Sequence, residues 1–66
     1  MIKFLSRTIA VGNNITLNQL GIMYQYGLVV RKNTFQAVQY YRLAANRRHA
    51  QAQCNLGFMY QHGLGV

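Results

Sequence analysis

The chain has 66 residues, with seven Lys or Arg and no Asp or Glu, and its formal net charge at pH 7 is +7. A chain of this length forms at most one small domain, which buries only about 60% of the surface that it exposes when unfolded, so we expect marginal stability. Without carboxylates it cannot supply a pair of acid/base carboxylates or a Ser-His-Asp triad. We therefore expect no enzymatic activity.

The residues that most often ligate metals or act as nucleophiles are few and scattered. Cys54 is the single cysteine, which excludes an intramolecular disulfide. It lies eight residues before His62, beyond hydrogen-bond reach on one helix, and His49 has no acidic partner. No Cys and His residues occur at zinc-binding spacing. We expect no catalytic residue, no metal and no cofactor.

The first twelve residues, MIKFLSRTIAVG, contain a short apolar run at residues 9–11. A secretory signal needs an apolar core of about 7 to 15 residues, and a membrane span needs about 20. We therefore expect no export signal and, by default, a cytoplasmic location.

The stretch QLGIMYQYGLVV at residues 19–30 recurs at residues 55–66 as NLGFMYQHGLGV, with eight of twelve positions identical. The offset from Leu20 to Leu56 is 56 − 20 = 36 residues. A period of this size is typical of stacked helical repeats, in which each unit buries its apolar face on its neighbour. In each copy, three residues spaced by four share one helix face. These are Thr16, Leu20 and Tyr24 in a helix expected at residues 14–26, and Ala52, Leu56 and Tyr60 in one expected at 49–62.

A third helix is expected between the two copies, at residues 34–47. Asn33 precedes Gln36 by three residues, a spacing that resembles a capping box. Small and aromatic residues follow at i, i+3, i+4, i+7 and i+8, which places them on one stripe. They are Ala37, Tyr40, Tyr41, Ala44 and Ala45.

Four glycines mark packing and helix ends. Gly21 and Gly57 each cost about 1 kcal/mol relative to Ala in a helix interior. We therefore expect a neighbouring helix to approach closely there, through the small pair Ala44 and Ala45. Gly27 and Gly63 are expected to end their helices in the left-handed conformation.

These residues resemble the Sel-one-like repeats, relatives of the tetratricopeptide repeats, whose pattern joins A-x-A-x-x-x-L-G-x-x-Y to a G-x-G-V loop and a second helix with W-Y-x-K-A-A. One match runs through Leu20, Gly21, Tyr24, Gly27, Val30, Ala37, Tyr41, Ala44 and Ala45. The other runs through Ala50, Ala52, Leu56, Gly57, Tyr60, Gly63, Gly65 and Val66. The resemblance implies an all-α fold, an α/α solenoid of antiparallel helix-turn-helix repeats, and a role in protein-protein interaction as an adaptor or scaffold.

The chain also departs from the family pattern. Val29 replaces the second loop glycine and Arg48 replaces a closing glycine, so a left-handed backbone at Arg48 would be strained by roughly 1 kcal/mol. Asn33 replaces the Asp of the family pattern, and Gln36 and Leu43 each replace a Lys. The middle unit is thus a weakened version of the repeat.

The family's first and second helices are called helix A and helix B, and the expected order here is B, A, B, A. Residues 1–12 would be a partial preceding repeat, 14–48 a full repeat and 50–66 the first half of the next. About three repeats normally make a stable array. We therefore expect that the open ends could support self-association, or that the chain is an excerpt of a longer array without an independent function.

The expected binding surface is the side of each helix A that faces away from its packing stripe. In the resembling arrays this side lines a concave groove that receives peptides; here its amides could bond a peptide backbone, and Ile22 and Phe58 could accept apolar side chains. The alternative is that Ile22 and Phe58 only pack against the adjoining repeat. The candidate residues are Gln19, Ile22, Tyr26, Gln51, Asn55, Phe58 and His62, with Ile15 on the same side.

The basic composition suggests a second function, binding of a nucleic acid or another anionic surface. Arg31 and Lys32 precede the middle helix, however, and Arg47 and Arg48 follow it, so the two pairs should lie at opposite edges. A nucleic-acid groove needs cations and stacking aromatics on one surface. A solvated edge is therefore favoured over a nucleic-acid site.

Overall fold

The computed structural model describes residues 14–66, which form three helices and no strand. They are α2 (Asn14–Tyr26), α3 (Thr34–Ala45) and α4 (Ala50–Gln61). The predicted all-α class is confirmed, and each helix agrees with its predicted span to within two residues at either end. The partial repeat expected at residues 1–12 lies outside the described residues.

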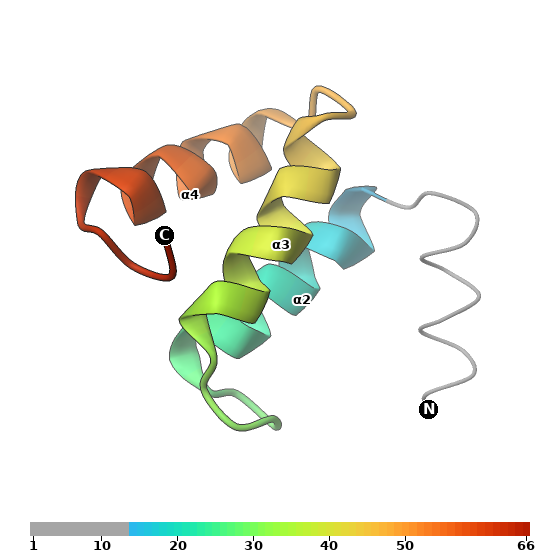
Figure 1. Cartoon of the computed structure of the whole chain (residues 1–66). Helices are drawn as coiled ribbons and strands as arrows, with labels where there is room; N and C mark the ends of the chain where they lie inside the picture. The colour runs from blue at the N-terminus through green and yellow to red at the C-terminus, as the bar shows by residue number, and fades with distance from the viewer. Residues whose placement is uncertain (1–13) are drawn as a thin grey trace.

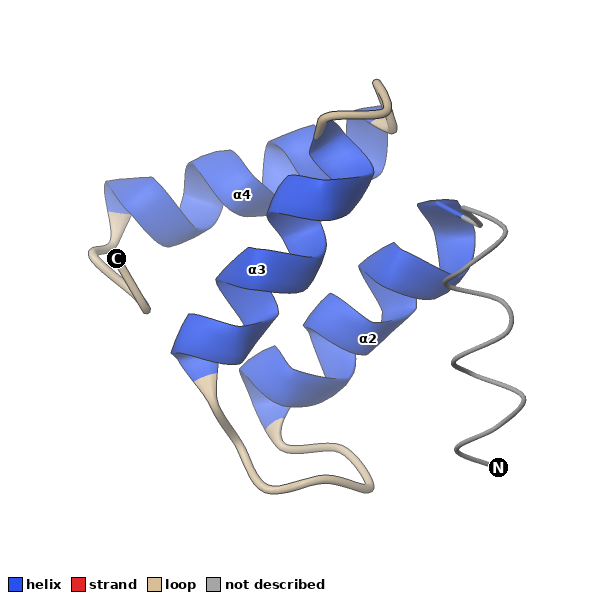
Figure 2. Ribbon diagram, turned by 45° about the vertical axis from the view of Figure 1, so that its right-hand side comes forward, coloured by secondary structure: helices blue, strands red, loops and turns tan. Residues whose placement is uncertain are grey.

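The helices α2 and α3 lie side by side and run in opposite directions, and α4 leaves the far end of α3 and crosses over it (Figures 1 and 2). No helix in the described range 14–66 is long and apolar enough to cross a membrane.

All three helices end in the same backbone turn. After α2, Gly27 has φ of +71° and the Leu28 N–H donates to the Met23 carbonyl at 2.9 Å. After α4, Gly63 has φ of +63° and the Leu64 N–H donates to Met59 at 2.8 Å. This is the Schellman motif, which satisfies the last free carbonyls of a helix and requires one left-handed residue. The predicted role of both glycines is confirmed.

The turn after α3 has the same hydrogen bonds but no glycine. The His49 N–H donates to the Ala44 carbonyl at 3.2 Å, and the left-handed residue is Arg48, with φ of +63°. Val29 also has a positive φ, of +69°. The left-handed region brings Cβ close to the following carbonyl oxygen, at roughly 1–2 kcal/mol per residue. The strain expected at Arg48 is present, and Val29, which also replaces a family glycine, is a second strained position.

The predicted start of α3 is confirmed in detail. The Asn33 side chain accepts a hydrogen bond from the Gln36 N–H at 3.0 Å and so caps one of the donors that the first turn leaves unpaired. Of the predicted stripe, Ala37, Tyr41 and Ala44 are fully buried.

The core consists of two clusters that α3 joins. One contains Ala37, Val38, Tyr41 and Met59, with Ile22, Tyr24, Leu56 and Leu64 packed around it. The other contains Leu17, Ala44 and Ala52, with Tyr40 and Ala45 beside it. A stacked pair, Tyr24 and Tyr40, connects α2 to α3 with ring centroids 5.6 Å apart.

Gly21 has the close neighbour that its position in a helix interior predicted, but the neighbour is a tyrosine ring. A Cβ at Gly21 would lie 2.3 Å from Cε1 of Tyr41, so the prediction that Ala44 and Ala45 make this approach is wrong. The ring crosses the glycine because its hydroxyl reaches Gln25, to whose Oε1 it donates a hydrogen bond of 2.5 Å. At Gly57, the counterpart of Gly21 in α4, no atom lies within 4 Å of such a Cβ, so the close approach expected there is wrong.

The face predicted for α4 is also partly wrong. Ala52 is buried as expected, but Tyr60 is 50% exposed and its hydroxyl accepts a hydrogen bond from Arg42. Met59 takes the buried place instead. The side of α4 that packs on the core therefore includes Ala52 and Met59 rather than Ala52 and Tyr60.

One buried polar contact links α2 directly to α4. Asn18 is 2% exposed, and its Oδ1 accepts a hydrogen bond from Nδ2 of Asn55 at 3.0 Å. A buried amide without a partner would be costly, so this bond favours the observed approach of the two helices.

Candidate functional site

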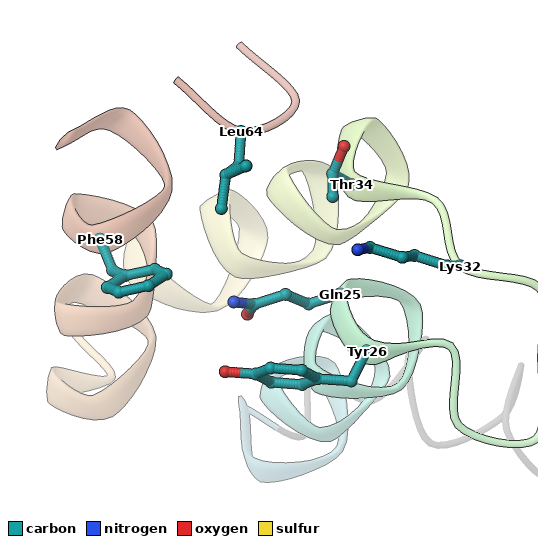
Figure 3. A pocket seen from close by; sticks show the side chains of 6 residues that line it. All are labelled: Gln25, Tyr26, Lys32, Thr34, Phe58 and Leu64. Atoms are coloured by element: carbon teal, nitrogen blue, oxygen red, sulfur yellow. The ribbon is translucent and has the colours of Figure 1, made fainter. Parts of the chain in front are cut away.

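A cavity of about 220 Å³ opens where the end of α2, the start of α3 and the side of α4 meet. The chain after α4 folds back to close one side of it (Figure 3). The six lining residues come from all of these segments. They are Gln25, Tyr26, Lys32, Thr34, Phe58 and Leu64.

The chain after α4 is held in place by its turn and by a second glycine. The Schellman bond directs Leu64 back onto the core, where it packs against the cluster that contains Met59. Gly65 then passes so near the start of α3 that a Cβ there would lie 2.3 Å from the Thr34 carbonyl oxygen. The absence of a side chain at Gly65 therefore allows this segment to form a wall of the cavity.

Two aromatic residues form the open apolar part of the cavity. Phe58 on α4 is 45% exposed and Tyr26 at the end of α2 is 63% exposed. The His62 ring lies against Phe58, with centroids 4.3 Å apart and planes tilted by 46°. This contact extends the exposed aromatic surface from the cavity to the end of α4.

The polar part of the cavity consists mainly of hydrogen-bond donors. Gln25 is buried, and its carboxamide oxygen is occupied by the Tyr41 hydroxyl, so its NH₂ group is left to face the cavity. Burial, and to a smaller extent the neighbouring Tyr26, raises the pKa of Tyr41 to about 12. The orientation of the Gln25 amide follows from the hydrogen bond itself, in which the Tyr41 hydroxyl is the donor. The Lys32 amino group points toward the middle of the cavity (Figure 3).

The structure separates the predicted binding residues into three groups. Tyr26 and Phe58 line the cavity, and His62 adjoins it through Phe58. Ile22 packs against the core and Asn55 bonds to Asn18, so both serve the interior of the domain. The remaining predicted residues, Gln19, Gln51 and the neighbouring Ile15, are exposed.

Four lining residues were not predicted from the sequence, namely Gln25, Lys32, Thr34 and Leu64. Lys32 was assigned to a solvated edge because it lies in a loop, and only the path of that loop brings it over the cavity. Leu64 lies in the family's loop motif, and its position depends on the close approach of Gly65 to Thr34. For Gln25 the sequence did contain one indication, because the residue recurs in the second copy of the repeat as Gln61.

The other basic residues of the described region do not line the cavity. Arg47 and Arg48 follow α3, at the end opposite to Arg31 and Lys32 (Figure 1). Within residues 14–66, no group of three His or Cys residues lies close enough to hold a metal ion. The described residues thus form an apolar pocket with hydrogen-bond donors at its rim.

The sequence matches the family model described as the Sel1 repeat, over residues 16–49 and again over residues 50–66. It is similar to protein sel-1 homolog 2 of Homo sapiens, with 39% identity over 62 residues. The protein of the same name from Mus musculus is 41% identical over 62 residues. Each alignment covers 92% of this chain and 9% of the relative.

A plant protein is also similar, the "ERAD-associated E3 ubiquitin-protein ligase component HRD3B" of Arabidopsis thaliana, with 34% identity over 55 residues, which is 83% of this chain and 9% of that protein. No solved structure matched the chain. The chain spans less than a tenth of the length of these relatives. The two family matches together cover most of it, and the chain therefore belongs to the Sel1 repeat family, whose repeats generally mediate protein-protein interaction.

Proposed function

We propose that this chain is a non-catalytic adaptor module that binds a peptide segment of a partner protein on the face formed by α2 and α4, with the cavity between Tyr26 and Phe58 as its centre. The observation that carries the proposal is the exposure of two aromatic rings on separate helices, beside an open cavity. Exposed aromatic side chains that frame a pocket are the usual anchors of protein interfaces.

The size of the cavity favours a side chain over a separate small molecule. Its volume of about 220 Å³ is below the roughly 300–1,000 Å³ of pockets that hold drug-sized ligands. One apolar side chain of a peptide would fill it, and the rest of the peptide would extend over Phe58 and His62.

The family supports the same class of function. The Arabidopsis relative is named as a component of a ubiquitin ligase, and is therefore a protein that works within an assembly. The described residues supply helices, an apolar pocket and hydrogen-bond donors, which are features of a binding module.

The test is a selection of peptides from a random display library against the intact 66-residue chain, followed by affinity measurements with two variants. Phe58→Ser removes a wall of the cavity, whereas Tyr60→Ser removes a similarly exposed aromatic from the same helix outside the cavity. We expect Phe58→Ser to weaken the selected peptides at least tenfold and Tyr60→Ser to change their affinity less than twofold. Equal losses in both variants would contradict the proposal, and circular dichroism would verify that both variants fold.

A further inference from the structure

On the side of the cavity that carries the charge, hydrogen-bond donors face the ligand without matching acceptors. Lys32 contributes an ammonium group directed into it, and Gln25 contributes the NH₂ group that the Tyr41 hydrogen bond leaves free. The Thr34 hydroxyl turns away from the middle of the cavity (Figure 3). Tyr26 can donate as well as accept. A ligand that brings a charged acceptor would therefore find partners here, whereas a ligand that brings a cation would meet Lys32.

The composition of the whole chain strengthens this asymmetry. There is no Asp or Glu anywhere in the sequence, so no side-chain carboxylate of this chain can pair with Lys32. The ammonium group is thus available to an outside carboxylate, and the net charge of +7 attracts acidic segments over a longer range.

The two kinds of groups lie on opposite sides of the cavity. Phe58 and Leu64 stand across from Lys32, with the Gln25 amide between them (Figure 3). From this juxtaposition we propose that the partner segment places an apolar side chain against Phe58 and Leu64. An adjacent Asp or Glu carboxylate of the same segment then binds Lys32 and the Gln25 amide. This inference rests on the function proposed above. The recognised class is an acidic peptide with a neighbouring apolar residue.

The experiment compares two short peptides that differ only in charge, acetyl-Ala-Phe-Glu-Ala-amide and acetyl-Ala-Phe-Gln-Ala-amide. Each is titrated into the intact ¹⁵N-labelled chain at low salt, and the backbone resonances of Phe58 and Leu64 report occupation of the cavity. We expect the Glu peptide to bind about fivefold more tightly, as for a partly exposed ion pair worth up to about 1 kcal/mol.

Two variants separate local recognition from general attraction to a basic chain. Lys32→Gln and Arg47→Gln each remove one positive charge, but only Lys32 lines the cavity. We expect Lys32→Gln to reduce the preference for the Glu peptide to less than twofold and Arg47→Gln to leave it near fivefold.

The outcomes separate this inference from the function on which it rests. If both peptides shift Phe58 and Leu64 equally, or if both variants reduce the preference equally, the cavity binds peptides without selecting acids and only this inference fails. If neither peptide shifts these resonances, and the peptides selected from the library do not either, the cavity is not a peptide site and both proposals fail.

Discussion

The pair Gly21 and Gly57 allows the packing of the repeat to be tested with one substitution made at two places. The two glycines occupy the same position in the repeated stretch, 36 residues apart, so replacement by Ala gives the same gain in intrinsic helix propensity of about 1 kcal/mol. Their surroundings differ. At Gly57 nothing lies within 4 Å of the new methyl group, whereas at Gly21 the methyl would lie 2.3 Å from Cε1 and 2.4 Å from Cδ1 of Tyr41.

The magnitudes follow from these contacts. Carbon atoms normally approach to about 3.5–4.0 Å, so the Tyr41 ring must move by more than 1 Å. Such overpacking typically costs about 1–3 kcal/mol, and loss of the Tyr41–Gln25 hydrogen bond adds about 1 kcal/mol. After the gain in propensity, Gly21→Ala should lower the free energy of unfolding by about 1–3 kcal/mol. Gly57→Ala should raise it by about 1 kcal/mol.

The assay is thermal unfolding followed by helical circular dichroism, at several protein concentrations so that association is detected. A change of 1 kcal/mol shifts the Tm of a domain this small by about 4–8 °C. We expect Gly57→Ala to melt higher than the parent chain and Gly21→Ala to melt lower. If both variants melt higher, the Tyr41 ring does not lie over Gly21, which contradicts the packing described for this core.

Further predictions concern strain, pH and capping. Val29→Gly and Arg48→Gly should each raise the free energy of unfolding by about 0.5–1 kcal/mol in urea titrations, because relief of the left-handed strain exceeds the added freedom of the unfolded chain; a loss at either site would contradict the strain. Burial raises the pKa of Tyr41 to about 12 from 10.0, so the folded chain retains a proton that the unfolded chain releases. The stabilising effect is complete below pH 10 and is lost as the pH rises toward 12, and Tyr41→Phe should show a shallower loss of stability between these values in pH-dependent melts. Asn33→Ala should cost about 1 kcal/mol of stability in the same assay, whereas an unchanged Tm would show that the cap to Gln36 contributes nothing.

Local features of the fold could be predicted from the sequence because each depends on near neighbours in the chain. The Asn33 cap needs only Gln36, and the left-handed turns need only a glycine, or its replacement Arg48, at the right distance from the helix. The 36-residue repeat predicted the helices and their order in the described region. These are short-range signals with a definite physical cause.

Features that depend on how helices cross could not be predicted in this way. The residue over Gly21 was expected to be a small alanine, yet it is Tyr41, because a hydrogen bond to Gln25 draws the ring across the glycine. Tyr60 was expected to share the packing face of its helix with Ala52, yet it is half-exposed and Met59 is buried instead. A repeat pattern places similar residues on the same face of each corresponding helix. The residues that pack against that face, however, differ from one repeat to the next.

The candidate site shows the same limit. Phe58 and Tyr26 were found from their helical spacing, but Lys32 and Leu64 come from loops whose paths depend on Gly65 and on the turn after α4. The side-chain amides on helix A were predicted to bind a peptide backbone, whereas the Asn55 amide donates its hydrogen bond to Asn18. The donor character of the cavity became visible only when the Tyr41 bond fixed the orientation of Gln25.

The peptide site proposed for this Sel1 repeat chain is the cavity between α2 and α4. The most direct measurement is a map of backbone resonance changes in the intact ¹⁵N-labelled chain, titrated with the tightest peptide from the library. We expect the largest changes at Tyr26, Lys32, Phe58 and Leu64. Changes concentrated instead around Arg47 and the turn after α3 would contradict it and would indicate a charge-driven surface at the opposite edge.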